Sequence, residues 1–130
     1  MFFKTLGSCL VLVMASMGVA HAQDAAAGEK VFGACRACHQ IGPSAHNAVG
    51  PMLNGVIGRP AGTIPGYTYS AANKNSGLTW DEATFTTYIQ NPQGVVKGTK
   101  MTYAGLKDPQ KIKDLIAFLK QYDATGNKAQ

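Results

Sequence analysis

The clearest hydrophobic pattern lies near the C-terminus. Ile112, Leu115, Ile116 and Leu119 recur at spacings of three and four residues, which places them on one face of an α-helix. Asp108 precedes this run as a capping acid and is followed by a proline, a residue favoured in the first helical turn. The pattern predicts a helix that begins just after Asp108 and buries this apolar stripe.

Two earlier segments are also predicted to be helical. Asp24 can cap a helix that continues through an alanine-rich run towards Phe32. Thr79, with Glu82 three residues later, fits a capping box in which Thr79 is the N-cap. The helix that it opens is expected to stop near Asn91. Its apolar side would consist of Phe85, Tyr88 and Ile89.

The chain between these three main helices is rich in Gly, Pro, Ser and Asn, above all in residues 41–78. This composition predicts ordered loop with one short helix near residues 70–75, and a second loop is expected over residues 94–105. Loops of this length are unusual in a compact domain unless they serve a purpose such as wrapping a buried ligand. No segment has a convincing strand pattern, so the fold class is all-α.

The first 22 residues have the pattern of a secretory signal peptide. A short basic start at Lys4 precedes an uncharged, mostly apolar run, and Ala20-His21-Ala22 fits the small-residue rule for cleavage. The apolar run is short for a membrane span, although an uncleaved N-terminal anchor is the alternative. We therefore expect residues 23–130 to form one mature domain in the periplasm, without a membrane span.

The net charge of the chain indicates what kind of molecule it binds. The 130-residue chain carries a formal net charge of +5 at pH 7, which is a mild basic bias. There are no basic clusters interleaved with aromatic residues, so the sequence favours an acidic protein partner and argues against nucleic acid. We expect the mature chain to be a monomer.

The most specific chemical signal is the run Cys-Arg-Ala-Cys-His at residues 35–39. On one helical turn Cys35 and Cys38 project from the same face with His39 beside them. This spacing lets two thiols add to the vinyl groups of a haem while the imidazole binds its iron, and it is typical of c-type haem attachment. A thioredoxin-like redox disulfide between Cys35 and Cys38 is the alternative, but that motif normally lies in a βαβ unit, and this chain has no such pattern. A zinc site needs about four ligands, and His46 is the only other candidate histidine in the mature chain.

The sixth position of the iron has two candidate methionines in the mature chain, Met52 and Met101. Met52 is too close to His39 in sequence to reach the opposite haem face easily. Methionine is ordinarily a core-filling residue, so spacing alone leaves Met101 open between that role and an iron ligand.

The chain resembles the class I cytochromes c, specifically the mitochondrial-type group and its small bacterial relatives. The likeness covers nearly the whole mature chain. It is carried by residues 35–39, Gly50-Pro51, Gly58-Arg59, residues 65–69 and 72–75, Trp80, Tyr88, Asn91-Pro92 and residues 98–101 and 114–119. The resemblance implies a cytochrome c fold, a methionine loop that makes Met101 the second axial ligand, and first and last helices that cross near Gly28, Phe32 and Leu115.

The resemblance also implies roles around the haem. The carbonyl of Pro51 would accept a hydrogen bond from His39 and fix its orientation. The residues expected to face the haem propionates are Arg59, Tyr69 and Trp80. The residues expected to make polar contacts near Met101 are Asn73, Tyr88 and Thr99. Taken without the resemblance, Tyr69, Trp80 and Tyr88 could equally be core aromatic residues whose polar group has found a hydrogen-bond partner.

A haem with both axial positions filled leaves no open site for a substrate, so the sequence predicts an electron carrier and not an enzyme. The alternatives are a haem enzyme or gas-binding protein, if Met101 is not a ligand, or a redox subunit fixed in a larger complex. The expected partners are a reductase and an oxidase or reaction centre. They would dock near Lys30, Lys100 and Lys107, the members of the family's lysine ring that this chain keeps.

One departure from the family pattern affects the methionine loop. Lys97 stands where relatives usually carry proline. Proline stiffens a compatible loop by restricting the unfolded chain, so we expect Met101 to be held less firmly here.

Overall fold

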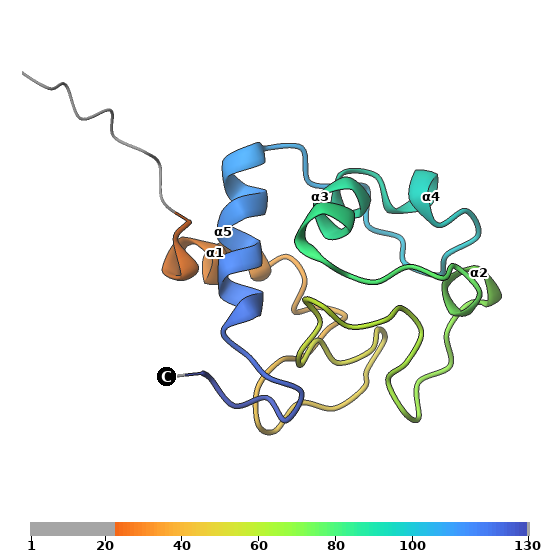
Figure 1. Cartoon of the computed structure of the whole chain (residues 1–130), viewed down its shortest axis with the longest axis horizontal. Coiled ribbons are helices and arrows are strands. Elements are labelled where there is room, and N and C mark those ends of the chain that lie inside the picture. The colour runs from red at the N-terminus through yellow and green to blue at the C-terminus, as the bar shows by residue number, and fades with distance from the viewer. Residues whose placement is uncertain (1–22, 130) are drawn as a thin grey trace, which may run out of the picture.

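The computed structural model describes residues 23–129, so the predicted signal peptide lies outside the described residues. The five helices are α1 (Ala25–Phe32), α2 (Ala71–Lys74), α3 (Glu82–Gln90), α4 (Pro92–Val95) and α5 (Pro109–Lys120). Within residues 23–129 there is no β-strand, and only two isolated bridges join extended residues. Long loops link the helices (Figure 1). The all-α prediction is confirmed, and no helix in the described part is long and apolar enough to cross a membrane.

The crossing of α1 and α5 forms one side of the molecule (Figure 1). The Asp24 side chain caps α1 by accepting from the backbone N–H groups of Ala26 and Ala27 at 2.9 and 3.1 Å. Asp108 caps α5 in the same way. Phe32 and Phe118 are fully buried at the crossing, with ring centroids 5.2 Å apart. Both predicted caps are confirmed, and so is the apolar stripe of α5, because all four of its residues are buried.

Helix α3 begins later than the sequence pattern predicts. Its N-cap is Asp81, whose carboxylate accepts from the N–H of Thr84 at 2.7 Å. Thr79 instead pairs with Pro60 in an antiparallel bridge, which holds its backbone in an extended conformation. The predicted capping box at Thr79 is therefore wrong. Glu82 becomes the first helical residue and forms an exposed ion pair with Lys120 at 3.5 Å.

Helix α4 follows α3 almost without interruption and was expected to be loop from residue 94 onward. Pro92 occupies its first turn, and the side chain of Asn91 accepts from the N–H of Gly94 at 3.1 Å. The loop prediction is thus wrong for residues 94 and 95. The short helix predicted near residues 70–75 is confirmed as α2, which Ser70 caps.

Candidate functional site

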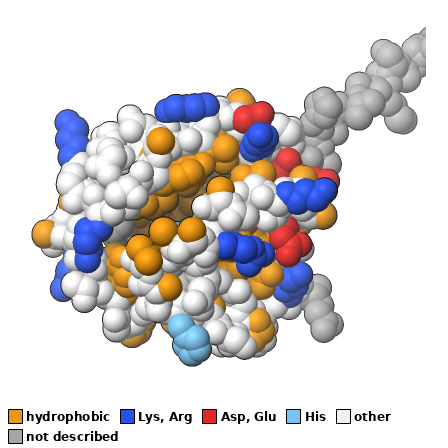
Figure 2. Space-filling view, turned by 180° about the vertical axis from the view of Figure 1, so that it is seen from behind, with side chains coloured by type: hydrophobic (Ala, Val, Ile, Leu, Met, Phe, Trp, Pro, Cys, Tyr) orange, Lys and Arg blue, Asp and Glu red, His pale blue; other side chains and the backbone are white. Residues whose placement is uncertain are grey.

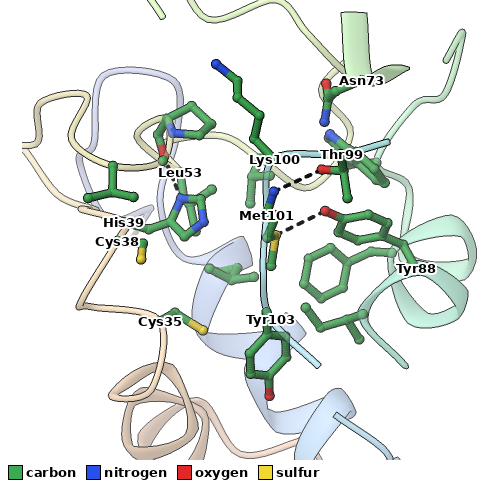
Figure 3. A pocket seen from close by; sticks show the side chains of 18 of the residues that line it. Cys35, Cys38, His39, Leu53, Asn73, Tyr88, Thr99, Lys100, Met101 and Tyr103 are labelled. Carbon is green, nitrogen blue, oxygen red and sulfur yellow. Dashed lines mark hydrogen bonds between the residues drawn. The ribbon is translucent and has the colours of Figure 1, made fainter. Parts of the chain in front are cut away.

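All the site residues predicted from the sequence line one cavity. Figure 2 shows its mouth as a hollow with hydrophobic side chains inside, and Figure 3 shows the interior. The predicted residues found there are Cys35, Cys38, His39, Pro51, Arg59, Tyr69, Asn73, Trp80, Tyr88, Thr99 and Met101. The apolar walls come from α1, α3, α5 and the loop around Leu53. The cavity is therefore continuous with the hydrophobic core of the protein.

The attachment motif lies in the turns that directly follow α1. The N–H groups of Cys38 and His39 both donate to the carbonyl of Cys35, at 3.1 and 2.9 Å. This compact turn brings the two thiols to the same side of the cavity as the imidazole (Figure 3). Both cysteines are free and half-buried, and burial is the main reason that the pKa of Cys35 is raised. The motif thus presents two unpaired thiols and one imidazole to the same space.

The imidazole of His39 is fixed from two sides. Its Nδ1 lies 2.7 Å from the carbonyl oxygen of Pro51. A carbonyl only accepts, so Nδ1 carries the proton and Nε2 keeps its lone pair for a metal. Burial lowers the pKa of His39 and so favours the neutral ring. On the other side Gly50 lies so close that a Cβ there would be 2.4 Å from Cε1 of the ring.

Met101 faces the cavity across from His39 (Figure 3). The hydroxyl of Tyr88 donates to the Met101 sulfur at 3.1 Å, and the Met101 N–H donates to Oγ1 of Thr99 at 3.2 Å. Burial raises the pKa of Tyr88 to about 12, so its hydroxyl stays protonated and able to donate at neutral pH. These contacts hold the sulfur in a defined orientation towards the cavity.

Two buried polar atoms lack a partner within the described protein. The guanidinium of Arg59 donates through Nη1 to the carbonyls of Met52 and Asn54, at 3.3 and 2.9 Å, but its Nε has no acceptor. The side-chain oxygen of Asn73 has no donor. Buried polar groups in folded proteins normally have partners. A flat apolar group with carboxylates at one edge, such as haem, fits the apolar walls and would supply an acceptor for the Arg59 Nε. Carboxylates only accept, so they do not pair with the Asn73 oxygen.

Some contacts of the site were not foreseen from the sequence. Gly50 was recognised as part of the family pattern, but its packing against His39 carries no signal in a single sequence. Gln93 and Tyr67 were not predicted to contribute. Tyr67 donates to the carbonyl of Val49 at 2.8 Å and so closes the rim of the cavity.

The three lysines predicted to dock partners differ in their surroundings. All three are exposed, and only Lys100 lines the cavity. Lys100 donates to the carbonyl of Thr68, and Lys107 donates to the carbonyl of Gln90. Two of the three ammonium groups are therefore held in place by the backbone.

Three features together define a c-type cytochrome: the attachment motif directly after α1, the methionine across the cavity, and the crossing of α1 with α5. Comparison with known proteins agrees. A model of the cytochrome c family matches residues 25–123, so the chain belongs to the cytochrome c family.

Several relatives resemble the chain over most of its length. Cytochrome c2 of Blastochloris viridis is 56% identical over 119 residues, which is 92% of this chain and 94% of that protein. Cytochrome c2 of Rhodoblastus acidophilus is 57% identical over 107 residues, 82% of this chain and 100% of that one. The solved structure of cytochrome cH from Methylobacterium extorquens superposes with a TM-score of 0.71 at 49% identity, covering 75% of this chain and 98% of the other.

Family membership settles the cofactor and the class of activity. The protein carries a covalently attached haem c, and Cys35 and Cys38 are the thiols available at the required spacing. It is an electron carrier that acts with redox partners, and it is not an enzyme.

Proposed function

We propose that the protein is a soluble periplasmic electron carrier in which His39 and Met101 are both axial ligands of the haem iron. The observation that carries this proposal is a pair of oriented metal-binding side chains. The neutral imidazole of His39 and the thioether of Met101 face each other across one apolar cavity. Haem iron supplies the one-electron chemistry. The protein supplies ligands that Pro51 and Tyr88 hold in place.

The arrangement suits electron transfer more than catalysis. With His39 and Met101 both bound, no coordination position is open to a substrate. A neutral sulfur ligand and an apolar pocket favour the ferrous state and so raise the reduction potential. Because the hydrogen bonds of Pro51 and Tyr88 can persist in both oxidation states, little rearrangement accompanies transfer of the electron.

The axial role of Met101 can be tested by comparing Met101→Leu with Met52→Leu. Met52 is the matched control, because it is the other methionine in the mature domain and its sulfur makes only a long contact of 3.8 Å with Asn54. We expect the iron–methionine charge-transfer band of the ferric protein to disappear in Met101→Leu and to remain in Met52→Leu. A wild-type ferric spectrum without this band would contradict the proposal.

The proposed docking surface is the rim of the cavity, near Lys30, Lys100 and Lys107. The exposed positions of these lysines and the net positive charge support it. Attraction between exposed charges is screened by salt. Oxidation of the ferrous protein by an anionic iron cyanide complex should therefore slow with salt, whereas oxidation by a cationic cobalt complex should not.

Individual lysines can be compared in the same assay. Lys107→Gln should slow the reaction with the anionic reagent more than Lys113→Gln, since Lys113 is an exposed lysine of α5 outside the proposed surface. Equal effects of the two variants, or a flat salt response, would contradict docking at this rim.

Export is the remaining part of the proposal. The N-terminal pattern supports removal of residues 1–22 and release of residues 23–130 as a monomer into the periplasm. N-terminal sequencing of the holoprotein from a periplasmic fraction should give Gln23 as the first residue or, if it has cyclised, a blocked end of matching mass. A protein that keeps residues 1–22 and stays with the membrane fraction would contradict it.

A further inference from the structure

The segment that carries Met101 has little backbone hydrogen bonding of its own. In the part of the chain that the structure describes, no backbone-to-backbone hydrogen bond involves residues 100–105. On its N-terminal side Gly98 has a φ of 89° and Lys97 takes the place of the family's proline. A chain segment tied this weakly keeps considerable conformational freedom unless side chains restrain it. The position of the Met101 sulfur therefore depends on side-chain contacts.

Gln93 provides one of these contacts from α4. Its Nε2 donates to the carbonyl of Met101 at 2.6 Å and lies 3.4 Å from the carbonyl of Thr99. Carbonyls accept only, so the contact can be made by the amide nitrogen and not by the amide oxygen. With the Met101 N–H already bound to Oγ1 of Thr99, both peptide groups that flank the Met101 α-carbon are held.

The support from which Gln93 reaches the loop is itself well anchored. Gln93 directly follows Pro92, which is buried. The side chain of Asn91 caps α4 by accepting from the N–H of Gly94. The N–H of Asn91 in turn donates to the carbonyl of Tyr88, at the end of α3. Helix α3 therefore provides the Tyr88 hydroxyl that binds the Met101 sulfur. It also anchors α4, whose Gln93 amide binds the Met101 backbone.

We propose that Gln93 is a positioning residue for the Met101 ligand, and that it restores to the methionine loop part of the restraint lost with proline at position 97. This inference rests on the proposed axial role of Met101. Its consequence is specific. Without the Gln93 amide, Met101 leaves the iron more readily and an external ligand takes its place at lower concentration.

The test is an imidazole titration of the ferric holoprotein, followed by loss of the iron–methionine charge-transfer band. Gln93→Leu removes the donor and keeps the bulk, and we expect it to bind imidazole about three- to ten-fold more tightly. Gln93→Glu places carboxylate oxygens against two carbonyls and should show at least as large an increase. The matched control is Gln90→Leu, because the Gln90 amide bonds only to the carbonyl of Thr86 in its own helix, at 2.9 Å. It should stay within about two-fold of wild type.

The possible outcomes distinguish failure of the Gln93 inference from failure of the proposed axial role of Met101. If the wild type shows the band but both Gln93 variants bind imidazole as the wild type does, Gln93 does not position Met101. If the wild type lacks the band and behaves like Met101→Leu, the axial role of Met101 has failed and this inference falls with it. Denaturation at saturating imidazole adds a check, since Met101 is then already displaced. Gln93→Leu should match wild type there, and an equal loss of stability with and without imidazole would instead show a general structural role.

Discussion

Gly28 of α1 packs against the backbone carbonyl of Asp114 in α5, so closely that a Cβ on Gly28 would lie 1.9 Å from that oxygen. The same two helices are joined at the start of α1, where the N–H of Asp24 donates to the carboxylate of Asp114 at 3.0 Å. The missing side chain at Gly28 therefore sets how closely the helices approach. Because α1 leads directly into the attachment motif and α5 forms one wall of the cavity, this crossing helps to fix the shape of the site.

Replacing Gly28 with alanine should destabilise the protein despite alanine's better helix propensity. The propensity gain is about 1 kcal/mol. The clash involves backbone atoms that cannot move aside, so its cost lies at or above the upper end of the usual overpacking range, ~3 kcal/mol. We expect a net loss of ~2 kcal/mol in the free energy of unfolding, measured by chemical denaturation.

The control for this variant is Gly33→Ala. Gly33 has helical dihedral angles, and a Cβ there would meet only the carbonyl of Lys30 in its own turn, at 3.0 Å. It should cost little or nothing. Equal stabilities of the two variants would show that the close helix approach is not required.

Gly50→Ala should disturb the site itself. A Cβ at this position would come within 2.4 to 2.9 Å of three atoms of the His39 ring. The ring cannot move away without lengthening its hydrogen bond to Pro51. We expect a loss of ~1–3 kcal/mol in stability, together with less covalently attached haem and an altered ferric spectrum. A Gly50→Ala protein with normal haem content and spectrum would mean that the imidazole has more room than this contact allows.

The sequence predicted the elements whose signals are local. The apolar stripe and capping acid of α5, and the cap at Asp24, depend only on nearby residues. The N-cap of α3 was misassigned because Thr79 and Asp81 are both good caps, and the choice between them is made by the distant Pro60 through its bridge to Thr79. Helix α4 has four residues and contains a glycine, so it has neither periodicity nor propensity to reveal it.

The site shows the same division between local and distant information. The spacing of Cys35, Cys38 and His39 gives their chemistry directly, whereas the choice of Met101 needed resemblance to a family. The packing of Gly50 on His39 depends on how the loop over residues 40–49 folds back. The bond from Gln93 to the Met101 carbonyl comes from a helix that was not predicted. No single-sequence pattern specifies such contacts.

The assignment of Asp81 as the cap of α3 predicts a particular pH dependence. The N–H of Thr84 is the main cause of a pKa below the ordinary 3.8 of this carboxyl. A carboxyl group whose pKa is lower in the folded than in the unfolded protein stabilises the fold at pH values above its unfolded-state pKa. This stabilisation disappears as the pH falls through the folded-state pKa. Compared with Asp81→Asn, the wild type should therefore have a constant stability advantage above about pH 5 that shrinks below pH 3.8.

Two comparisons test this assignment. At neutral pH, Asp81→Ala should lower the denaturation midpoint more than Thr79→Ala does. An advantage over Asp81→Asn that persists unchanged to the lowest pH at which the protein stays folded would show that the Asp81 charge does not stabilise the helix.

The haem should also be required for folding, because the core is built around its cavity. Eight of the twelve buried hydrophobic residues in the described chain line the cavity. At the usual cost of unfilled core volume, a cavity of about 260 Å³ corresponds to ~6 kcal/mol, which is comparable to the whole stability of a small domain. The Nε of Arg59, which has no acceptor in the described protein, adds to this cost. We therefore expect Cys35→Ala/Cys38→Ala protein without haem to be largely unfolded.

Circular dichroism of this double variant tests the prediction, with wild-type chain produced without haem attachment as the control for the two substitutions. The four buried residues away from the cavity are Val96, Ile112, Ile116 and Phe118. Three of them belong to α5, so any residual helix should come from the crossing of α1 and α5, and Gly28→Ala should remove it. Native-like helix content in both haem-free proteins would mean that the long loops hold the cavity open unaided, and that the haem enters a fold already formed.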